Sequence, residues 1–148
     1  MINNRTHEYY MKIALKEAEK AFAIGEVPIG AVVVSNNQII ARAHNLTERL
    51  NDVTAHAEMQ AFTSASEFLG GKYLHKCKIY VTIEPCVMCS GASYWTQIDE
   101  IIFGAKDDKR GPIKRDLQIH HPKTKITSGV LANECASLIQ MFFLEKRK

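Results

Sequence analysis

Two cysteines separated by two residues, Cys86 and Cys89, follow a proline in the segment TIEPCVMCSGA. This spacing is typical of three kinds of chemistry: a redox pair, half of a structural zinc site, or two ligands of a catalytic metal. The chain has two other cysteines, Cys77 and Cys135. Neither stands at metal-ligand spacing, and we interpret both as buried core thiols, a common state of free cysteine.

His56, thirty residues before Cys86 in the segment TAHAEM, offers a third donor. One imidazole and two thiolates make three protein ligands, the number found in catalytic zinc sites, whereas structural sites close with a fourth. A water in the open position on zinc ionises with a pKa of about 7, which would supply hydroxide at neutral pH. Cys86 and Cys89 would project from the first turn of a helix, where the helix dipole favours thiolates.

Glu58, two residues after His56, could carry the proton that attack by hydroxide requires. Taken alone, an acidic residue near a helix N-terminus is explained by the helix dipole. Joined to the cysteine motif, His56 and Glu58 complete the pattern His-x-Glu followed by Pro-Cys-x-x-Cys, which is typical of zinc nucleoside deaminases. A redox role for the cysteines would leave His56 and Glu58 unexplained.

The overall composition predicts one globular domain that spans residues 1–148, because 46% of the residues are hydrophobic and 24% are charged. No segment approaches the ~20 apolar residues of a membrane span, and the N-terminus lacks the pattern of a secretory signal. We therefore expect a cytoplasmic protein without a membrane partner, with its cysteines reduced. The net charge of +3 leaves nucleic-acid binding open, since the basic residues between Lys106 and Lys125 suit either a solvated loop or a phosphate-contacting surface.

Alternating helical and strand patterns predict the elements that hold these residues. Apolar spacing predicts a helix from Thr6 to Ile24, and the segments IGAVVV and QIIARA flank SNN as a β-hairpin. Thr54 is predicted to cap a helix that ends near Phe68. The segments KIYVTI, CVMCSGASYW and EIIFGA predict a strand, a helix and a parallel strand with a right-handed crossover.

A long loop from Lys106 to Thr124, a strand KITSGV and a helix from about Asn133 to Lys146 complete the predicted framework. The five strands include an antiparallel hairpin and a parallel pair, so the sheet is mixed. The expected fold class is α/β, a three-layer α/β/α sandwich around a mixed five-stranded sheet.

Several segments resemble, in order and spacing, those of the bacterial tRNA-specific adenosine deaminase family. They are GEVPIGAVVV, AHN, DVTAHAEMQA, YVTIEPCVMCSGA, FGAKDDKRG, HHP, and SGVLANECASL followed by FF. The resemblance runs from about Tyr9 to the C-terminus. The metal motif alone fits any member of the wider cytidine deaminase-like superfamily, whereas the last segment and FGAKDDKRG are similar to the tRNA branch.

The resemblance implies a cytidine deaminase-like fold and hydrolysis of adenosine to inosine at the wobble position of tRNA. It implies that His56, Cys86 and Cys89 bind one Zn²⁺ per subunit. Glu58 would be the catalytic residue that carries a proton to adenine N1 and then to the departing ammonia. The implied partners are the anticodon stem-loop of tRNA and a second copy of the chain in a homodimer. The family's substrate-binding positions fall on Asn45, Pro28, Asp107, His121 and Phe142.

One segment departs from the family, because PIKRDLQI stands after Gly111 where small residues are common. Lys114 and Arg115 there either contact RNA or are solvated. Two other functions stay open: a deaminase of a free nucleobase or nucleoside of the guanine or cytosine type, and a catalytically silent zinc subunit. The presence of Glu58 argues against the second.

Overall fold

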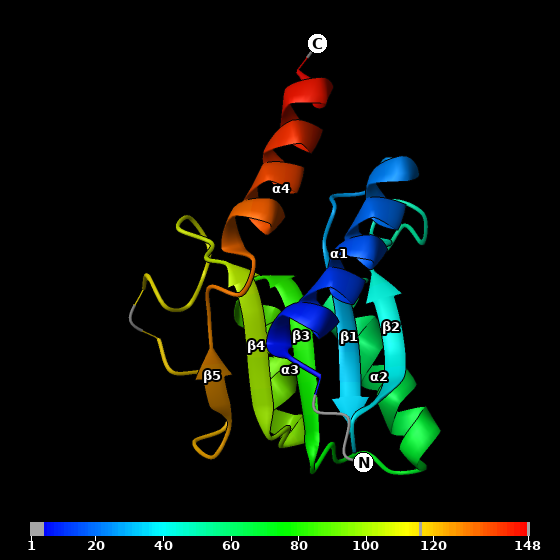
Figure 1. The fold of residues 1–148 in the computed structure, drawn as a ribbon, viewed down its shortest axis with the longest axis vertical. Helices are drawn as coiled ribbons and strands as arrows, with labels where there is room; N and C mark the ends of the chain where they lie inside the picture. The colour runs from blue at the N-terminus through cyan, green and yellow to red at the C-terminus, as the bar shows by residue number, and fades with distance from the viewer. Residues whose placement is uncertain (1–4, 116, 148) are drawn as a thin grey trace.

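The structure is a computed structural model that describes residues 5–115 and 117–147. Within them, five strands form one mixed sheet in the order β2-β1-β3-β4-β5 (Figure 1). The strands are β1 (Gly30–Ser35), β2 (Gln38–His44), β3 (Cys77–Ile83), β4 (Glu100–Ala105) and β5 (Lys125–Thr127). Strand β1 is antiparallel to β2 and β3, whereas β3, β4 and β5 are parallel. The predicted mixed sheet is confirmed.

The hairpin between β1 and β2 turns at Asn36 and Asn37, whose φ angles are 52° and 60°. Two successive left-handed residues are typical of the type I′ turn, which matches the twist of the flanking strands, and asparagine tolerates this conformation better than most residues. The hairpin predicted around SNN is therefore confirmed, and its asparagines explain the tight turn.

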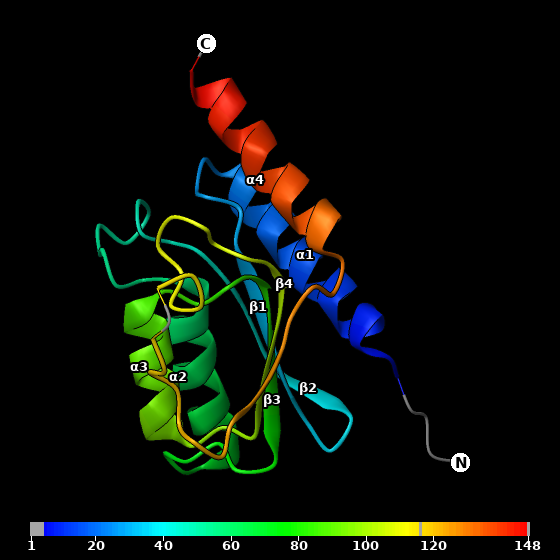
Figure 2. The same ribbon diagram turned by 90° about the vertical axis from the view of Figure 1, so that its left-hand side faces the viewer.

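Helices cover both faces of the sheet, as Figure 2 shows. Helices α1 (His7–Ala23) and α4 (Ala132–Lys146) pack on one face, and α2 (Ala57–Leu69) and α3 (Val87–Thr96) lie on the other. Side chains of β1 alternate between the two cores: Val32 faces α1, whereas Val33 faces α2. The three-layer α/β/α sandwich is confirmed.

Helix α1 packs very close to the sheet at Gly30. A Cβ atom there would collide with the carbonyl oxygen of Ala14 and lie 2.5 Å from the backbone nitrogen of Ala18. Since both neighbours are backbone atoms, they cannot move aside as a flexible side chain would. Close contact between α1 and β1 therefore requires glycine at this position.

Replacing Gly30 with alanine is expected to destabilise the protein by about 1–3 kcal/mol, because the added methyl group pushes α1 off the sheet. The thermal midpoint should fall by roughly 3–10 °C in a denaturation scan. Gly71→Ala is the matched control, since no atom lies within 4 Å of the added Cβ atom. Equal midpoints for the two variants would contradict the close packing of α1 on β1.

The N-terminus of α2 differs from the sequence prediction. The N-cap is His56 and not Thr54, so the predicted cap was wrong. Asp52 Oδ1 accepts hydrogen bonds from both the amide and the hydroxyl of Thr54, each at 2.8 Å. The threonine therefore closes a turn before the helix, and the helix begins with the histidine.

Between β4 and β5 the described residues form turns and irregular backbone, as predicted for the loop from Lys106 to Thr124. Among the helices of the described residues, none is long and apolar enough to cross a membrane.

Candidate active site

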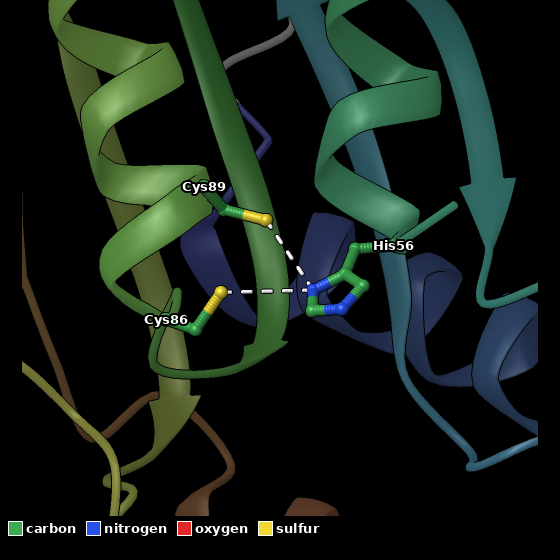
Figure 3. Close-up of side chains that lie close together, drawn as sticks. All are labelled: His56, Cys86 and Cys89. Carbon is green, nitrogen blue, oxygen red and sulfur yellow. Dashed lines mark hydrogen bonds between the residues drawn. The ribbon is translucent and has the colours of Figure 1, made fainter. Parts of the chain in front are cut away.

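The three predicted metal ligands meet at one edge of the sheet, where α2 and α3 begin (Figure 3). His56 is the N-cap of α2, Cys86 is the N-cap of α3, and Cys89 lies in the first turn of α3. Strand β3 leads into α3 through Glu84 and Pro85. Parallel packing of the two helices on the same face thus brings together residues that are thirty positions apart.

The donor atoms of this cluster are spaced for a tetrahedral zinc ion. His56 Nδ1 lies 3.6 Å from Cys86 Sγ and 3.5 Å from Cys89 Sγ. All three donors lie within 4.8 Å of one another, and no fourth histidine, cysteine, aspartate or glutamate in the described parts of the chain joins them. A tetrahedral ion with ordinary Zn–N and Zn–S bonds would separate nitrogen from sulfur by about 3.6 Å. The cluster therefore fits zinc without rearrangement.

The pKa values of the three cluster residues are also shifted, and the shift of Cys86 favours metal binding. Hydrogen bonding to Cys89 is the main cause that lowers the pKa of Cys86 to about 4, against the opposing effect of burial, and His56 lowers it further. The hydrogen bond to Cys86 raises the pKa of His56, and the same partner together with burial raises the pKa of Cys89. The lowered pKa of Cys86 favours its thiolate, the form that binds metals.

Glu58 lies in the first turn of α2 beside the cluster and is 3% exposed. Burial is the main cause that raises the pKa of this carboxyl group to about 7; the nearby Cys86 acts in the same direction, while its own backbone amide and His56 oppose the shift. A carboxyl group with a pKa near neutrality can both accept and donate a proton at physiological pH. Its position beside the cluster gives Glu58 the geometry of a proton carrier.

A pocket of about 860 Å³ opens from the cluster toward the C-terminal half of α4. His56, Glu58 and Cys86 line it. Apolar and basic side chains of α4 and of the loop after β4 also line it. These pocket residues of the loop after β4 and of α4 are Lys109, Arg110, Ile139, Gln140, Phe143, Leu144 and Arg147.

Not all predicted substrate-binding residues reach the pocket. Asn45 and Asp107 line it. Pro28 is buried between Val27 and Ile29, and these two neighbours line the pocket in its place.

Two other predicted substrate-binding residues, His121 and Phe142, lie outside the pocket lining. His121 packs against the ring of Tyr94 with a centroid distance of 5.3 Å. Phe142 is 6% exposed and packs edge-on against Phe22 at 5.7 Å, whereas its neighbour Phe143 lines the pocket. The structure therefore brings Phe143, and not Phe142, to the pocket.

Two residues that the sequence analysis did not identify hold the wall next to Asn45. Glu26 is fully buried and accepts hydrogen bonds from the backbone amides of Arg49 at 2.7 Å and Glu48 at 3.1 Å. Gln60 Nε2 donates to the carbonyl oxygens of His44 at 2.9 Å and Ala55 at 3.1 Å. Gln60 therefore ties the end of β2 to the turn before His56. Neither residue belongs to a recognisable motif. An acidic or amide side chain in a loop or helix is ordinarily solvated, so the sequence gives no sign that these two are structural.

The fold and the convergent cluster define a zinc-dependent deaminase. The model of the cytidine and deoxycytidylate deaminase zinc-binding region matches residues 4–105. The tRNA-specific adenosine deaminase of Bacillus subtilis (strain 168) is 45% identical over 147 residues, which cover 95% of this chain and 91% of that protein. The chain belongs to the cytidine and deoxycytidylate deaminase family and, within it, to the tRNA-specific adenosine deaminases.

Two solved structures show how specific this relationship is. One, from studies of A-to-I editing by tRNA:A34 deaminases at the wobble position of transfer RNA, is 40% identical with a TM-score of 0.82. The match covers 88% of this chain and 98% of the chain in that structure. A guanine deaminase from Bacillus subtilis is 38% identical with a TM-score of 0.66, over 69% of this chain and 66% of that one. The fold alone therefore does not distinguish a tRNA substrate from a free base.

Proposed function

We propose that this chain hydrolyses adenosine to inosine at the wobble position of tRNA. The observation that carries the proposal is the cluster of His56, Cys86 and Cys89 at zinc spacing with the buried Glu58 beside it, in a chain that belongs to the tRNA-specific adenosine deaminases. When bound, zinc would lower the pKa of a coordinated water to about 7 and so make it nucleophilic at neutral pH. We assign one zinc ion to each subunit.

Glu58 is the proposed catalytic residue. Adenine C6 is a poor electrophile until N1 is protonated, and a neutral Glu58 carboxyl group can donate that proton. The resulting Glu58 carboxylate takes a proton from the attacking water and passes it to the exocyclic nitrogen as the C6–N6 bond breaks and ammonia leaves, and the second proton of the water returns Glu58 to its neutral form. Water supplies the new C6 oxygen, so adenosine and water yield inosine and ammonia. Asn45, which lines the same pocket, is the proposed hydrogen-bonding partner of the nucleoside.

An RNA substrate is supported by the extent and charge of the pocket. The lining continues from the cluster to Phe143 and Arg147 near the end of α4, and Lys109 and Arg110 stand along it. Basic side chains bind phosphates, and aromatic faces stack on unpaired bases. We therefore propose the anticodon stem-loop as the partner, with Asp107 beside the target nucleotide. Loop nucleotides reduce the cost of extruding the base because they are already unpaired.

The function is tested by incubating the zinc-loaded protein with an anticodon stem-loop, free guanine and free cytosine. We expect adenosine to be read as guanosine at the wobble position after reverse transcription, and no ammonia from either base. The guanine deaminase relative makes a free-base deaminase the alternative function. Ammonia release from guanine or cytosine, with the stem-loop unchanged, would support that alternative and contradict the proposal.

We further propose a single deaminase domain over residues 1–148, a homodimer and a cytoplasmic location. Large apolar side chains are exposed just before α2 and on α3. Among them, the exposed fraction is 85% for Val53 and 76% for Trp95. Burial of such a surface against a second copy would stabilise a dimer. Measuring the molecular mass of the protein in solution tests whether it is a dimer. A cytoplasmic location follows from the proposed tRNA substrate and from the need to keep Cys86 and Cys89 reduced.

A further inference from the structure

Glu84 is a buried carboxylate to which the proposed chemistry gives no role. It is 4% exposed, follows β3 directly and lines the pocket. Its Oε1 accepts a hydrogen bond from the amide of Asp107 at 3.1 Å, and its Oε2 accepts one from the amide of Ile113 at 2.8 Å. One carboxylate therefore holds both ends of the segment 107–113, which we call the 107–113 loop.

The 107–113 loop is folded closely around this carboxylate. A Cβ atom on Gly111 would collide with Glu84 Oε1 and lie 2.5 Å from Glu84 Cδ, so glycine is required there. Gly111 N donates to the carbonyl oxygen of Asp107 at 2.8 Å. Asp107 Oδ1 accepts from the amides of Lys109 at 3.1 Å and Arg110 at 3.0 Å. These contacts fold the loop around the carboxylate of Glu84.

The shape of the 107–113 loop decides where its charges lie. Lys109 and Arg110 line the pocket from this loop, and both side chains are exposed. We propose that Glu84 is a positioning residue for RNA, which fixes the 107–113 loop so that Lys109 and Arg110 meet phosphates next to the target adenosine. The inference rests on the proposed function, because it requires an RNA substrate.

Glutamine at position 84 would break this arrangement without changing the size of the side chain. One carboxylate oxygen becomes an NH₂ group, which donates and cannot accept. Either the amide of Asp107 or that of Ile113 then faces another donor in a buried position, so one end of the loop is released. Hydrogen bonds to an ionised acceptor are among the stronger ones in proteins, which makes the effect measurable.

The test compares the wild type with Glu84→Gln in deamination of an anticodon stem-loop transcript at several salt concentrations. We expect KM to rise about tenfold, the factor expected for loss of one hydrogen bond to a charged group, while kcat stays close to the wild-type value. The slope of log(kcat/KM) against log salt should become shallower by about one, because the phosphate contacts of Lys109 and Arg110 are weakened. A purely structural role would not change the salt slope.

Glu100→Gln is the matched control. Glu100 is a buried carboxylate, 6% exposed, that accepts from Thr127 Oγ1 at 2.7 Å. It pairs with Lys78 at the opposite end of β3 from Glu84. We expect Glu100→Gln to lower the thermal midpoint without changing KM or the salt slope. Gly111→Ala, which displaces the same loop, should reproduce the kinetic change of Glu84→Gln.

Two results would overturn the proposal. The first is a Glu84→Gln enzyme with a lowered thermal midpoint but with wild-type KM and salt slope. The second, which holds even if Glu84→Gln fails to fold, is a double variant K109Q/R110Q with unchanged KM and salt slope, since these exposed side chains are not needed for folding. A wild-type protein that leaves the stem-loop unedited would instead refute the proposed function.

Discussion

Glu58→Gln protein is expected to keep its zinc and to deaminate the anticodon stem-loop about 10²- to 10⁴-fold more slowly than the wild type. Glutamine has the size of glutamate but cannot take up and release a proton. Glu58 lies beside the metal cluster without belonging to it, so its replacement should leave the ligands in place. Single-turnover rates with saturating enzyme, together with zinc content by mass spectrometry, separate loss of chemistry from loss of metal.

The control for this variant is Glu67→Gln. Glu67 lies on the same helix as Glu58 but is exposed. The Glu67→Gln enzyme should edit the stem-loop at the wild-type rate. A Glu58→Gln enzyme that turns over at the same rate as Glu67→Gln would remove Glu58 from the mechanism, even if the fold and the zinc were unchanged.

Cys86→Ser is expected to lose most of its bound zinc and all measurable activity. The thiolate is one of three protein ligands, and a serine hydroxyl group is a poor ligand because it stays protonated at neutral pH. The loss should exceed that of Glu58→Gln, since the nucleophile and the electrostatic stabilisation disappear together. Zinc is measured after dialysis against a weak chelator, and activity is measured on the stem-loop.

Cys77→Ser makes the same chemical change away from the site. Cys77 is fully buried, and its Sγ lies 3.5 Å from the carbonyl oxygen of His75, to which a serine hydroxyl group could also donate. This variant should retain equimolar zinc and activity. If instead Cys86→Ser kept equimolar zinc while Cys77→Ser lost it, the ligand set assigned to the chain would be wrong.

The metal cluster could be predicted from the sequence because its residues carry their own signal. A histidine, a glutamate two positions later and a Pro-Cys-x-x-Cys motif are rare in combination, and turns or helix starts had to hold them. The helix pattern placed Cys86 and Cys89 at a helix start, where the structure has them. The position of the helix cap was less predictable, since the turn closed by Asp52 moved it from Thr54 to His56.

The pocket walls could not be predicted in the same way. Glu26 and Glu84 look like surface residues in a sequence, and only the tertiary structure shows that backbone amides surround them. The choice between Phe142 and Phe143 depends on how α4 is rotated against α1, which the short apolar pattern of a terminal helix does not specify. Contacts between distant segments decide both cases.

The distribution of the metal ligands along the chain has a consequence for biosynthesis. His56 follows the β1–β2 hairpin, whereas Cys86 and Cys89 follow β3, which pairs with β1 from more than thirty residues away along the chain. The hairpin can form while the chain is still leaving the ribosome, but the two thiols stay without their histidine until β3 enters the sheet. Metal capture therefore depends on the pairing of β3 with β1, whereas β4 and β5 join the sheet from later parts of the chain.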